Sequence, residues 1–371
     1  MDRKKNFKDK KNHIAFFISS LHGGGAERIF VNLANEFSKR NFNVDLILVR
    51  KKGPYLKDVV EKVNIVDLNV SGVLKSLFPL IKYLRKRNPD IIISTLNRVN
   101  LVAIAARIIS HCPVKLIIRQ ANCFTPSSNR KTKLLGRFLY HRADHIIAIS
   151  GGVKKNLLKT FKLSEQKIKV IYNPVYGLPI VAESKKKVSH PFFRDKEMKI
   201  ILGVGRLVKQ KNFPLLIMAF KKVREVQKVR LIICGEGEKR SELENLIKEY
   251  GLENDISMPG FVDNPYAYMA KADVFALSSL YEGFGNVLVE AMACGTSVVS
   301  TDCPSGPSEI LENGKYGKLV PVNDTDALAK AIEEILKNPM DKTILKERAK
   351  YFSIENAVNK YQDLFNEGIK E

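Results

Sequence analysis

Short runs of β-branched and aromatic residues recur along the first half of the chain and alternate with amphipathic segments. The runs are IAFFIS at 14–19, VDLILV at 44–49, DIIIST at 90–95, KLIIR at 115–119 and HIIAIS at 145–150. Continuous apolar runs of this length are typical of strands buried on both faces. Residues 27–39 place a stripe of apolar side chains at helical spacing: Ile29, Phe30, Leu33, Ala34 and Phe37. This alternation predicts a doubly wound parallel sheet.

The second half of the chain repeats the alternation. Predicted strands lie at 201–205, 230–235, 255–260, 273–279, 296–301 and 317–321, with helices at 213–224, 239–250, 286–293 and 327–336. The stretch at 173–199 carries three prolines and a run of lysines, which is typical of a linker. We therefore expect an α/β protein with two Rossmann-like domains that face a cleft, at 1–176 and 200–352, joined by a linker at 177–199. Residues 353–371 are expected to form a C-terminal helix, and its return to the first domain is one possibility.

Charge distinguishes the two halves. The 371 residues include 62 Lys and Arg and 39 Asp and Glu, which gives a net charge of +23. Residues 1–176 hold 34 basic and 11 acidic residues, whereas residues 177–371 hold 28 of each. The whole surplus lies in the first half, which predicts an anionic partner for that domain. The 45% hydrophobic content excludes a disordered chain.

Two segments of the basic half combine cations with apolar residues at helical spacing. Residues 73–89 carry one such stripe, and residues 130–140 have the same character; the first stripe consists of Leu74, Leu77, Phe78, Ile81 and Leu84. Basic amphipathic helices suit an anionic membrane surface. Packing of both stripes against the sheet is equally open. Our hypothesis is that the first domain rests on the inner leaflet of the membrane.

Cysteine spacing and hydropathy bear on location. The five cysteines are an odd number with no pair at two-residue spacing, which argues against a disulfide framework or a zinc ribbon. The apolar run that follows the basic first residues is too short for a signal sequence or a membrane span. We expect a cytoplasmic protein that is peripheral on the cytoplasmic face of the membrane.

A glycine-rich turn, HGGGAE at 22–27, follows the first predicted strand and opens the first predicted helix. Glycines let a backbone approach a ligand closely, and a helix N-terminus offers free amide donors to a phosphate. The turn matches neither the G-x-G-x-x-G dinucleotide fingerprint nor a P-loop. A purely structural turn is the alternative.

Two cations stand at the end of the first predicted strand of the second half. Gly203, Val204, Gly205 and Arg206 end that strand, and Lys211 follows five residues later. Cations at the carboxyl end of a parallel strand suit a diphosphate. The alternative is a pair of solvated bases in a loop.

The segment EGFGNVLVEAMACG at 282–295 is the most specific signal. Glu282 lies in a glycine-rich loop, Asn286 begins a predicted helix, and Glu290 lies about one turn further in among apolar residues. A carboxylate is costly to bury unless it accepts hydrogen bonds, and ribose hydroxyls would donate them. The amides near Asn286 and Val287 would point toward a phosphate. A loop acid and an exposed Glu are the alternative for this segment alone.

Together, these motifs resemble the retaining glycosyltransferases of family 4, which have the GT-B fold. The resemblance covers nearly the whole chain and includes SGGV at 150–153 and NPV at 173–175. The segments DCPSGPSEI at 302–310 and RQAN at 119–122 are similar to members that add hexose or N-acetylhexosamine units to lipid-linked bacterial surface glycans. The resemblance implies a retaining transfer from a nucleotide sugar, UDP-linked, to a lipid-linked or polysaccharide acceptor. No cofactor is implied, because the nucleotide sugar is a co-substrate.

The resemblance also implies roles for matching residues. Arg206 and Lys211 would neutralise the diphosphate, and Glu282 would face the donor sugar; these three are the implied catalytic residues. The first domain would bind the acceptor. The implied donor-binding residues are Gly24, Gly25, Gly205, Gly260, Val262, Phe284, Gly285, Asn286, Val287 and Glu290. Possible acceptor or sugar contacts are His22, Arg119 and Asn122.

The chain departs from the family pattern at one position. Many members carry a histidine near the end of the strand that here reads LIIRQAN, and that histidine contacts the donor sugar. This chain has Arg119 and Gln120 there instead. No general base is assigned, since in this family the leaving diphosphate is proposed to accept the acceptor's proton.

The tripeptide Asp324-Thr325-Asp326 spells the Asp-x-Asp pattern of metal-using transferases. It directly precedes a predicted helix, where Asp and Thr are typical caps. We predict no metal ligands and a metal-independent reaction, because Arg206 and Lys211 supply positive charge.

Two other functions stay open. A basic nucleic-acid-binding protein would suit the pI near 9.7, but the chain has no zinc-finger spacing, RNP-type motif or Trp, and we expect no nucleic acid partner. A GT-B enzyme of another kind, a glycogen-type synthase or a sugar-phosphate phosphorylase, is the second alternative. The chain is short for such an enzyme.

Overall fold

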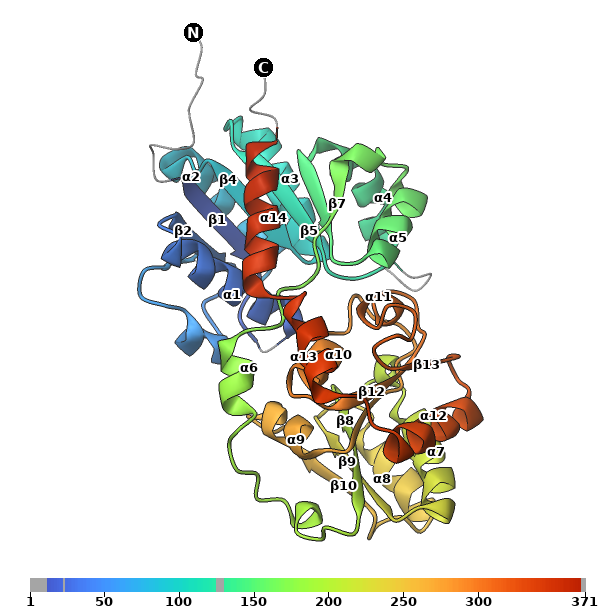
Figure 1. Ribbon diagram of the computed structural model, residues 1–371. Coiled ribbons are helices and arrows are strands. Elements are labelled where there is room, and N and C mark those ends of the chain that lie inside the picture. Colours follow the sequence, from blue (N-terminus) through green and yellow to red (C-terminus); the bar gives the residue numbers. More distant parts are fainter. Residues whose placement is uncertain (1–11, 23, 125–129, 368–371) are drawn as a thin grey trace. The chain divides into compact units, whose positions relative to one another are not determined.

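The computed structural model describes residues 12–22, 24–124 and 130–367, and the chain divides into two compact units (Figure 1). Unit 1 comprises residues 1–174 together with 354–371, and unit 2 comprises residues 175–353. Residues 177–199, which the sequence suggested as a linker, belong to unit 2. Their helix α6 (Leu178–Glu183) contacts α9 (Pro265–Lys271) and α10 (Asn286–Ala293), and Ile180 is buried. An apolar anchor therefore holds this proline-containing stretch to the unit.

In the described part of the chain, unit 1 contains a seven-stranded parallel sheet with the order β3-β2-β1-β4-β5-β6-β7. Its strands are β1 (His13–Ile18), β2 (Asn43–Leu48), β3 (Asn64–Asp67), β4 (Ile91–Thr95), β5 (Lys115–Gln120), β6 (His145–Ala148) and β7 (Ile168–Val170). Its helices are α1 (Gly25–Lys39), α2 (Leu77–Arg87), α3 (Asn97–Ser110), α4 (Arg130–Leu139), α5 (Gly151–Phe161) and α14 (Ile354–Asn366). Short 3₁₀ turns are η1 (Pro54–Asp58), η2 (Leu74–Ser76), η3 (Tyr140–Arg142) and η4 (Glu165–Lys167).

The core of unit 1 follows from the apolar runs of the sequence. Ile14 to Ile18 of β1 are fully buried, and Phe16 packs edge-on against Phe30 of α1. Burial of one such aromatic side chain contributes about 2–3 kcal/mol. The strands expected from continuous runs are confirmed, but β3 and β7 were not predicted. These two strands have four and three residues, lie at the two edges of the sheet and are only partly buried, so they lack the continuous apolar run of a central strand.

The C-terminal helix α14 belongs to unit 1, where it lies beside α1. Tyr361 and Phe365 of α14 pack against Phe37 of α1. The ammonium of Lys115, at the start of β5, donates to the carbonyls of Leu364 and Phe365 at 2.8 and 3.0 Å. A cation at these last carbonyls complements the C-terminal end of the helix dipole. The last helix of the chain thus completes the first unit.

Unit 2 contains a six-stranded parallel sheet in its described residues, with the order β10-β9-β8-β11-β12-β13. Its strands are β8 (Lys199–Val204), β9 (Val229–Cys234), β10 (Ile256–Gly260), β11 (Val274–Leu277), β12 (Ser297–Thr301) and β13 (Lys318–Val320). Besides α6, α9 and α10, its helices are α7 (Phe213–Val226), α8 (Arg240–Glu249), α11 (Pro307–Ile310), α12 (Thr325–Lys337) and α13 (Lys342–Lys350). Its 3₁₀ turns are η5 (Pro191–Phe193) and η6 (Lys209–Lys211).

The strand order of each sheet reverses at one place. In unit 1 the reversal falls between β1 and β4, and in unit 2 it falls between β8 and β11. Open parallel sheets bind ligands outside the carboxyl ends of their strands at this switch point. The two sheets, with helices linking successive strands, confirm the predicted Rossmann-like fold class.

The expected apolar stripe at 73–89 is wrong in part. Leu80, Ile81, Tyr83 and Leu84 form the buried face of α2, whereas Phe78 is 77% exposed. Successive residues turn by about 100° around a helix, so a face centred on Leu80 and Leu84 leaves Phe78 on the far side.

Helix α4 also leaves its large apolar side chains, Leu134, Leu135 and Phe138, exposed. Among the described residues, none of the helices combines the length and hydropathy needed to cross a membrane.

Candidate active site

An ion pair joins the two strands at the switch point of unit 2. Lys211 ends η6, which follows β8, and Glu282 lies in the loop that follows β11. The Lys211 Nζ lies 2.6 Å from Oε1 of Glu282, and the two side chains are 14% and 9% exposed. Two of the three residues predicted as catalytic are therefore in direct contact. Their partial burial strengthens the pairing, because the surroundings screen charge less than water does.

Buried hydroxyls hold both members of this pair. The Ser279 hydroxyl donates to Oε1 of Glu282 at 2.6 Å, and the Thr301 hydroxyl donates to the carbonyl of Ser279 at 2.6 Å. The Ser278 hydroxyl donates to the carbonyl of Lys211 at 2.8 Å. None of these hydroxyls was singled out from the sequence. The available signal was the change from apolar to polar residues where the β11 and β12 runs end at this edge.

The loop that carries Glu282 rests on the segment after β12. The backbone N–H of Glu282 donates to the carbonyl of Pro304 at 3.1 Å. Gly306 has φ 101°, and a Cβ at this position would lie 1.8 Å from the carbonyl oxygen of Phe284. Only glycine allows so close an approach. The segment DCPSGPSEI therefore has a structural role in positioning the candidate site.

Glycines lie at the ends of three neighbouring strands of this sheet, and one of them contacts the lysine. A Cβ on Gly205 would lie 3.0 Å from Cε of Lys211, so the lysine stem passes close over this glycine. Gly235, at the end of β9, has φ 145°, and its N–H donates to the carbonyl of Gly260 at 2.8 Å. Gly260 ends β10 with φ 83°, and Val262, two residues further, is half-buried. These glycines let the chain ends of β8, β9 and β10 approach one another closely, and Gly205 contacts the lysine directly.

Helix α10 begins at Asn286, as the sequence predicted. Gly285 is its N-cap, in the left-handed region, and Asn286 and Val287 are half-buried in the first turn. The Phe284 side chain is buried and packs on Phe352 at a ring distance of 5.4 Å. A contact between Phe284 and a donor would therefore come from its backbone.

Glu290 is 9% exposed, among residues of α10 that are fully buried. The structure favours the buried carboxylate over the alternative of an exposed Glu. Arg206 lies in the loop after Gly205 and is exposed, and its carbonyl accepts from the N–H of Val208 at 2.8 Å. Arg206, the third predicted catalytic residue, thus lies close in sequence to Lys211, and its side chain is exposed to solvent.

The glycine-rich turn of unit 1 is described in part. Gly24 is the N-cap of α1 and Gly25 its first residue, while His22 is exposed and Gly23 lies outside the described residues. A Cβ on Gly24 would lie 2.3 Å from Oε2 of Glu27, because that side chain folds back over the cap. The α1 N-terminus therefore carries a carboxylate of its own.

Arg119 is 1% exposed at the end of β5. Its guanidinium donates to the Thr95 hydroxyl at 3.1 Å and to the side-chain oxygen of Asn173. Burial lowers the pKa of Arg119, and the neighbouring Tyr361 phenol acts in the opposite direction. A contact of this side chain with acceptor or sugar would require it to leave these partners.

Asn122, two residues beyond β5, is exposed, and its carbonyl accepts from the side chain of Gln120 at 2.6 Å. Gln120 is itself buried and also accepts from the Tyr140 hydroxyl at 2.9 Å. The position at which many members of the family carry a histidine is therefore occupied here by buried, hydrogen-bonded polar residues.

The Asp-x-Asp pattern is a helix start. The Asp324 carboxylate accepts from the N–H of Ala327 at 2.9 Å and caps α12, as predicted. Among the described residues, no group of three or more His, Cys, Asp or Glu is placed to hold a metal ion. All five cysteines are free thiols, and burial raises the pKa of Cys303, beside Glu282, to about 12.

Comparison with known proteins places the chain among glycosyltransferases. Residues 184–352 match the family described as glycosyl transferases group 1, and residues 23–176 match glycosyltransferase family 4. A Campylobacter jejuni enzyme, N-acetylgalactosamine-N,N'-diacetylbacillosaminyl-diphospho-undecaprenol 4-alpha-N-acetylgalactosaminyltransferase, is 34% identical over 355 residues, which cover 91% of this chain and 93% of that protein. A second enzyme of that organism, an alpha-1,4-N-acetyl-D-galactosaminyltransferase acting on a diphospho-undecaprenol-linked glycan, is 27% identical over 95% of this chain and 98% of its own.

The fold comparison agrees. The crystal structure of Anabaena HepE in complex with UDP matches with a TM-score of 0.80 at 22% identity, covering 96% of this chain and 99% of that one. Sequence relatives along nearly the full length and the arrangement of two parallel sheets thus lead to the same assignment. The chain belongs to glycosyltransferase family 4 and is a glycosyltransferase with the GT-B fold.

Proposed function

We propose that this enzyme transfers a hexose or an N-acetylhexosamine from a nucleotide sugar to a lipid-linked or polysaccharide acceptor in bacterial surface glycan synthesis. UDP is the proposed nucleotide, and net retention at the anomeric carbon is the proposed outcome. The observation that carries the proposal is the Lys211–Glu282 pair at the switch point of unit 2. The names of the two Campylobacter relatives, which specify transfer onto diphospho-undecaprenol-linked glycans, support the acceptor class.

The diphosphate of the donor would lie against Lys211 and the N-terminus of α10. Negative charge grows on the diphosphate as the glycosidic bond breaks, and a fixed cation stabilises that charge most when it needs no reorganisation. The hydrogen bond from Ser278 to the lysine carbonyl and the ion pair at Nζ hold Lys211 in place before the donor arrives. Arg206, exposed in the adjoining loop, would add a second cation.

Two carboxylates of unit 2 would recognise different parts of the donor. Glu282 would face the sugar, and the bonds from Lys211 and Ser279 to its Oε1 hold it in one orientation. Glu290, which is 9% exposed, would accept hydrogen bonds from the ribose hydroxyls. With two cations to neutralise the diphosphate, we propose that the transfer needs neither a metal ion nor a cofactor.

Unit 1 would bind the acceptor and lie on the cytoplasmic face of the membrane. Leu134, Leu135 and Phe138 are exposed on α4, whose other residues include Arg130 and Arg137. An exposed apolar face with cations beside it suits an anionic lipid surface. Co-flotation with anionic vesicles that weakens as salt rises is the expected result. Failure to bind at low salt would contradict this part of the proposal.

Donor and acceptor can be tested in sequence. UDP is expected to raise the melting temperature of the purified protein more than GDP or ADP, because a ligand that binds only the folded state stabilises it. UDP-sugars would then be assayed with an undecaprenyl-diphosphate-linked acceptor and with a soluble glucan as the control. NMR of the product anomeric proton tests retention. No stabilisation by any nucleotide would contradict the proposed donor. Transfer to the glucan alone would indicate a glycogen-type synthase and would contradict the proposed role in surface glycan synthesis.

Membership of a glycosyltransferase family favours this function over nucleic-acid binding, the alternative that the basic composition left open. The positive charge of unit 1 would instead serve the anionic acceptor and the lipid surface. A glycogen-type activity is the outcome that the soluble glucan control would reveal.

A further inference from the structure

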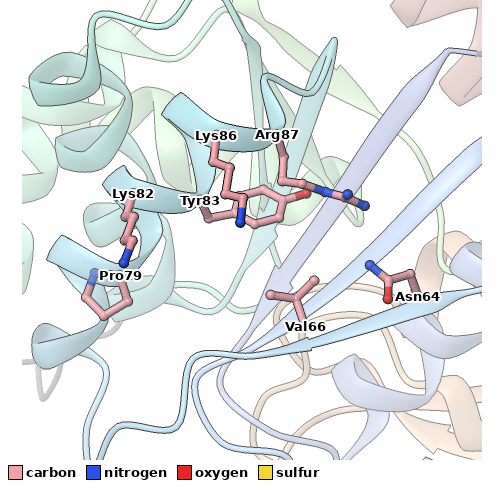
Figure 2. Close-up of a pocket in the computed structure, with 7 residues that line it drawn as sticks. All are labelled: Asn64, Val66, Pro79, Lys82, Tyr83, Lys86 and Arg87. Carbon is pink, nitrogen blue, oxygen red and sulfur yellow. The ribbon is translucent and has the colours of Figure 1, made fainter.

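A pocket of about 450 Å³ lies in unit 1 between helix α2 and the edge strand β3 (Figure 2). Its lining residues come from these two elements only: Asn64 and Val66 from β3, and Pro79, Lys82, Tyr83, Lys86 and Arg87 from α2. Asn64 is the first residue of β3, so the pocket borders the edge of the sheet at which its parallel strands begin. The glycine-rich turn follows the opposite, carboxyl end of β1. The pocket is therefore separate from that turn.

One buried carboxylate holds the walls of the pocket in place. Asp45 of β2 is fully buried and accepts from the Tyr83 hydroxyl at 2.5 Å and from the Asn64 amide at 2.8 Å. The Arg87 guanidinium donates to the same carboxylate at 3.4 Å. Burial alone would raise the pKa of Asp45, but hydrogen bonds from His13, Tyr83 and Asn64 hold it below its usual value. Three lining residues are thus fixed around an ionised group that neutralises Arg87.

The remaining two cations of the pocket are not neutralised in this way. Lys82 and Lys86 lie one turn apart on α2, and both are exposed. Among the described residues, no carboxylate pairs with either ammonium. Like charges at this spacing repel each other, and a shared anion would relieve that repulsion. A phosphate group, with its negative charge and acceptor oxygens, is the matching ligand for two ammonium groups and the Asn64 amide.

The surface beside the pocket indicates the source of that phosphate. Leu74 and Phe78, on the turn and helix that lead into the pocket, are each 77% exposed. A soluble phosphate compound needs no apolar neighbour, whereas a phospholipid presents a headgroup and an acyl boundary together. Amphipathic surface helices bind this boundary by burying apolar residues next to cations.

We propose that the α2 pocket binds the phosphate of an anionic phospholipid headgroup through Lys82 and Lys86, while Leu74 and Phe78 enter the acyl boundary. The pocket deepens the membrane contact proposed above by placing one headgroup site on unit 1. It does not depend on donor binding in unit 2. Failure of the pocket and failure of the proposed transferase reaction are therefore distinguishable.

The test compares the full-length protein with two double variants. Lys82→Ala/Lys86→Ala removes the pocket pair, and Lys155→Ala/Lys159→Ala removes two exposed lysines at the same spacing on α5. Co-flotation is measured with phosphatidylcholine vesicles that contain or lack phosphatidylglycerol. Each base near an anionic surface contributes a factor of about five, so the pocket variant should lose roughly thirtyfold in apparent affinity and the control no more than about twofold. Equal losses of vesicle affinity in the two variants would overturn the proposal. Wild-type binding that does not increase with phosphatidylglycerol would overturn it too.

A second measurement separates a lipid from a free anion. Phe78→Ser is expected to weaken vesicle binding severalfold while leaving the melting temperature unchanged, because this side chain is exposed. Inorganic phosphate is the soluble probe. One combination of results would assign the pocket to a soluble anion and overturn the proposal. Inorganic phosphate would stabilise the protein saturably, and both Lys82→Ala/Lys86→Ala and Phe78→Ser would bind vesicles as well as the wild type does. Cooperative thermal unfolding of every variant shows that each one is folded.

Discussion

Two cations at the carboxyl ends of parallel strands have different surroundings in the two units. Lys211 stands in the turn after β8, keeps part of its side chain exposed and pairs with a carboxylate. Arg119 is a residue of β5 itself, is fully buried and donates to a hydroxyl and an amide oxygen. The difference shows that position relative to the strand end affects how far each cation is buried. The cation just beyond β8 keeps 14% of its side chain exposed, whereas the one within β5 is 1% exposed.

The net charges of the two units also differ. Unit 1 contains 36 basic and 15 acidic residues and unit 2 contains 26 and 24. Unit 1 presents its surplus partly along α2 and α4 beside exposed apolar side chains, whereas the nearly neutral unit 2 contains the buried ion pair. The charge surplus of unit 1 thus lies beside exposed apolar side chains, whereas the ion pair of unit 2 lies in partly buried surroundings at the switch point of its sheet.

The largest effect should come from removing the cation that the proposal places on the diphosphate. Lys211→Ala is expected to lower the transfer rate by about 10³-fold, equivalent to about 4 kcal/mol of transition-state stabilisation. The loss of its partner also leaves Glu282 with the Ser279 hydroxyl, so a smaller drop in stability should accompany it. Single-turnover assays and thermal unfolding measure the two effects. Lys209→Ala, which changes an exposed lysine of the same turn, should retain near-normal turnover. Normal turnover in Lys211→Ala would remove the catalytic assignment.

The corresponding change in unit 1 should affect folding instead of chemistry. Arg119→Met is expected to lower the free energy of unfolding by about 3 kcal/mol, because it leaves Thr95 and Asn173 without this donor in a buried setting. Chemical denaturation measures the loss, and Arg98→Met, at an exposed position on α3, provides the control. If Arg119→Met instead raised the KM for acceptor or donor while stability stayed the same, Arg119 would be a ligand contact and the comparison with Lys211 would fail.

Glu290 extends the comparison of Lys211 with Arg119, because it is a buried charge in the nearly neutral unit 2. Glu290→Gln is expected to weaken UDP binding by about tenfold to a hundredfold, since a hydrogen bond to a charged group contributes about 1.5–3 kcal/mol. Calorimetry with UDP and with 2',3'-dideoxy-UDP locates the effect. The wild-type protein should discriminate strongly between these nucleotides and the variant much less. Full discrimination in Glu290→Gln would mean that another group recognises the ribose.

The parts predicted correctly from the sequence depend on local patterns. The continuous runs at 14–19 and 90–95 predicted central strands because both of their faces are buried, and the start of α10 followed from its glycine-rich loop. The edge strands β3 and β7 have no such run and were not predicted.

The Thr301 hydroxyl reaches the carbonyl of Ser279 from a strand that is distant in the sequence, so no local pattern identified this contact. The Ser279 hydroxyl bonds Glu282 three residues further along, a contact that only the change from apolar to polar residues at the end of β11 signals. The apolar stripe predicted at 73–89 was wrong in part for a related reason: Leu74 and Phe78 are exposed, whereas Ile81 and Leu84 are buried. The boundary between η2 and α2, and the placement of Tyr83 over Asp45, depend on tertiary packing.

The smallest expected effect concerns Asp324, a surface carboxylate that contrasts with the buried Glu282 and Glu290. Asp324→Ala should cost about 1 kcal/mol, because it removes the N-cap of α12 and nothing else. Asp341 provides a matched control, since its carboxylate caps α13 by accepting from the N–H groups of Thr343 and Ile344. Both alanine variants should lose similar stability and keep the wild-type transfer rate in EDTA. Two outcomes would show that a metal site contributes to the reaction. In the first, only Asp324→Ala loses activity. In the second, EDTA inactivates the wild-type protein and added Mg²⁺ restores its activity. The cations of unit 2 would then not be sufficient to neutralise the leaving diphosphate.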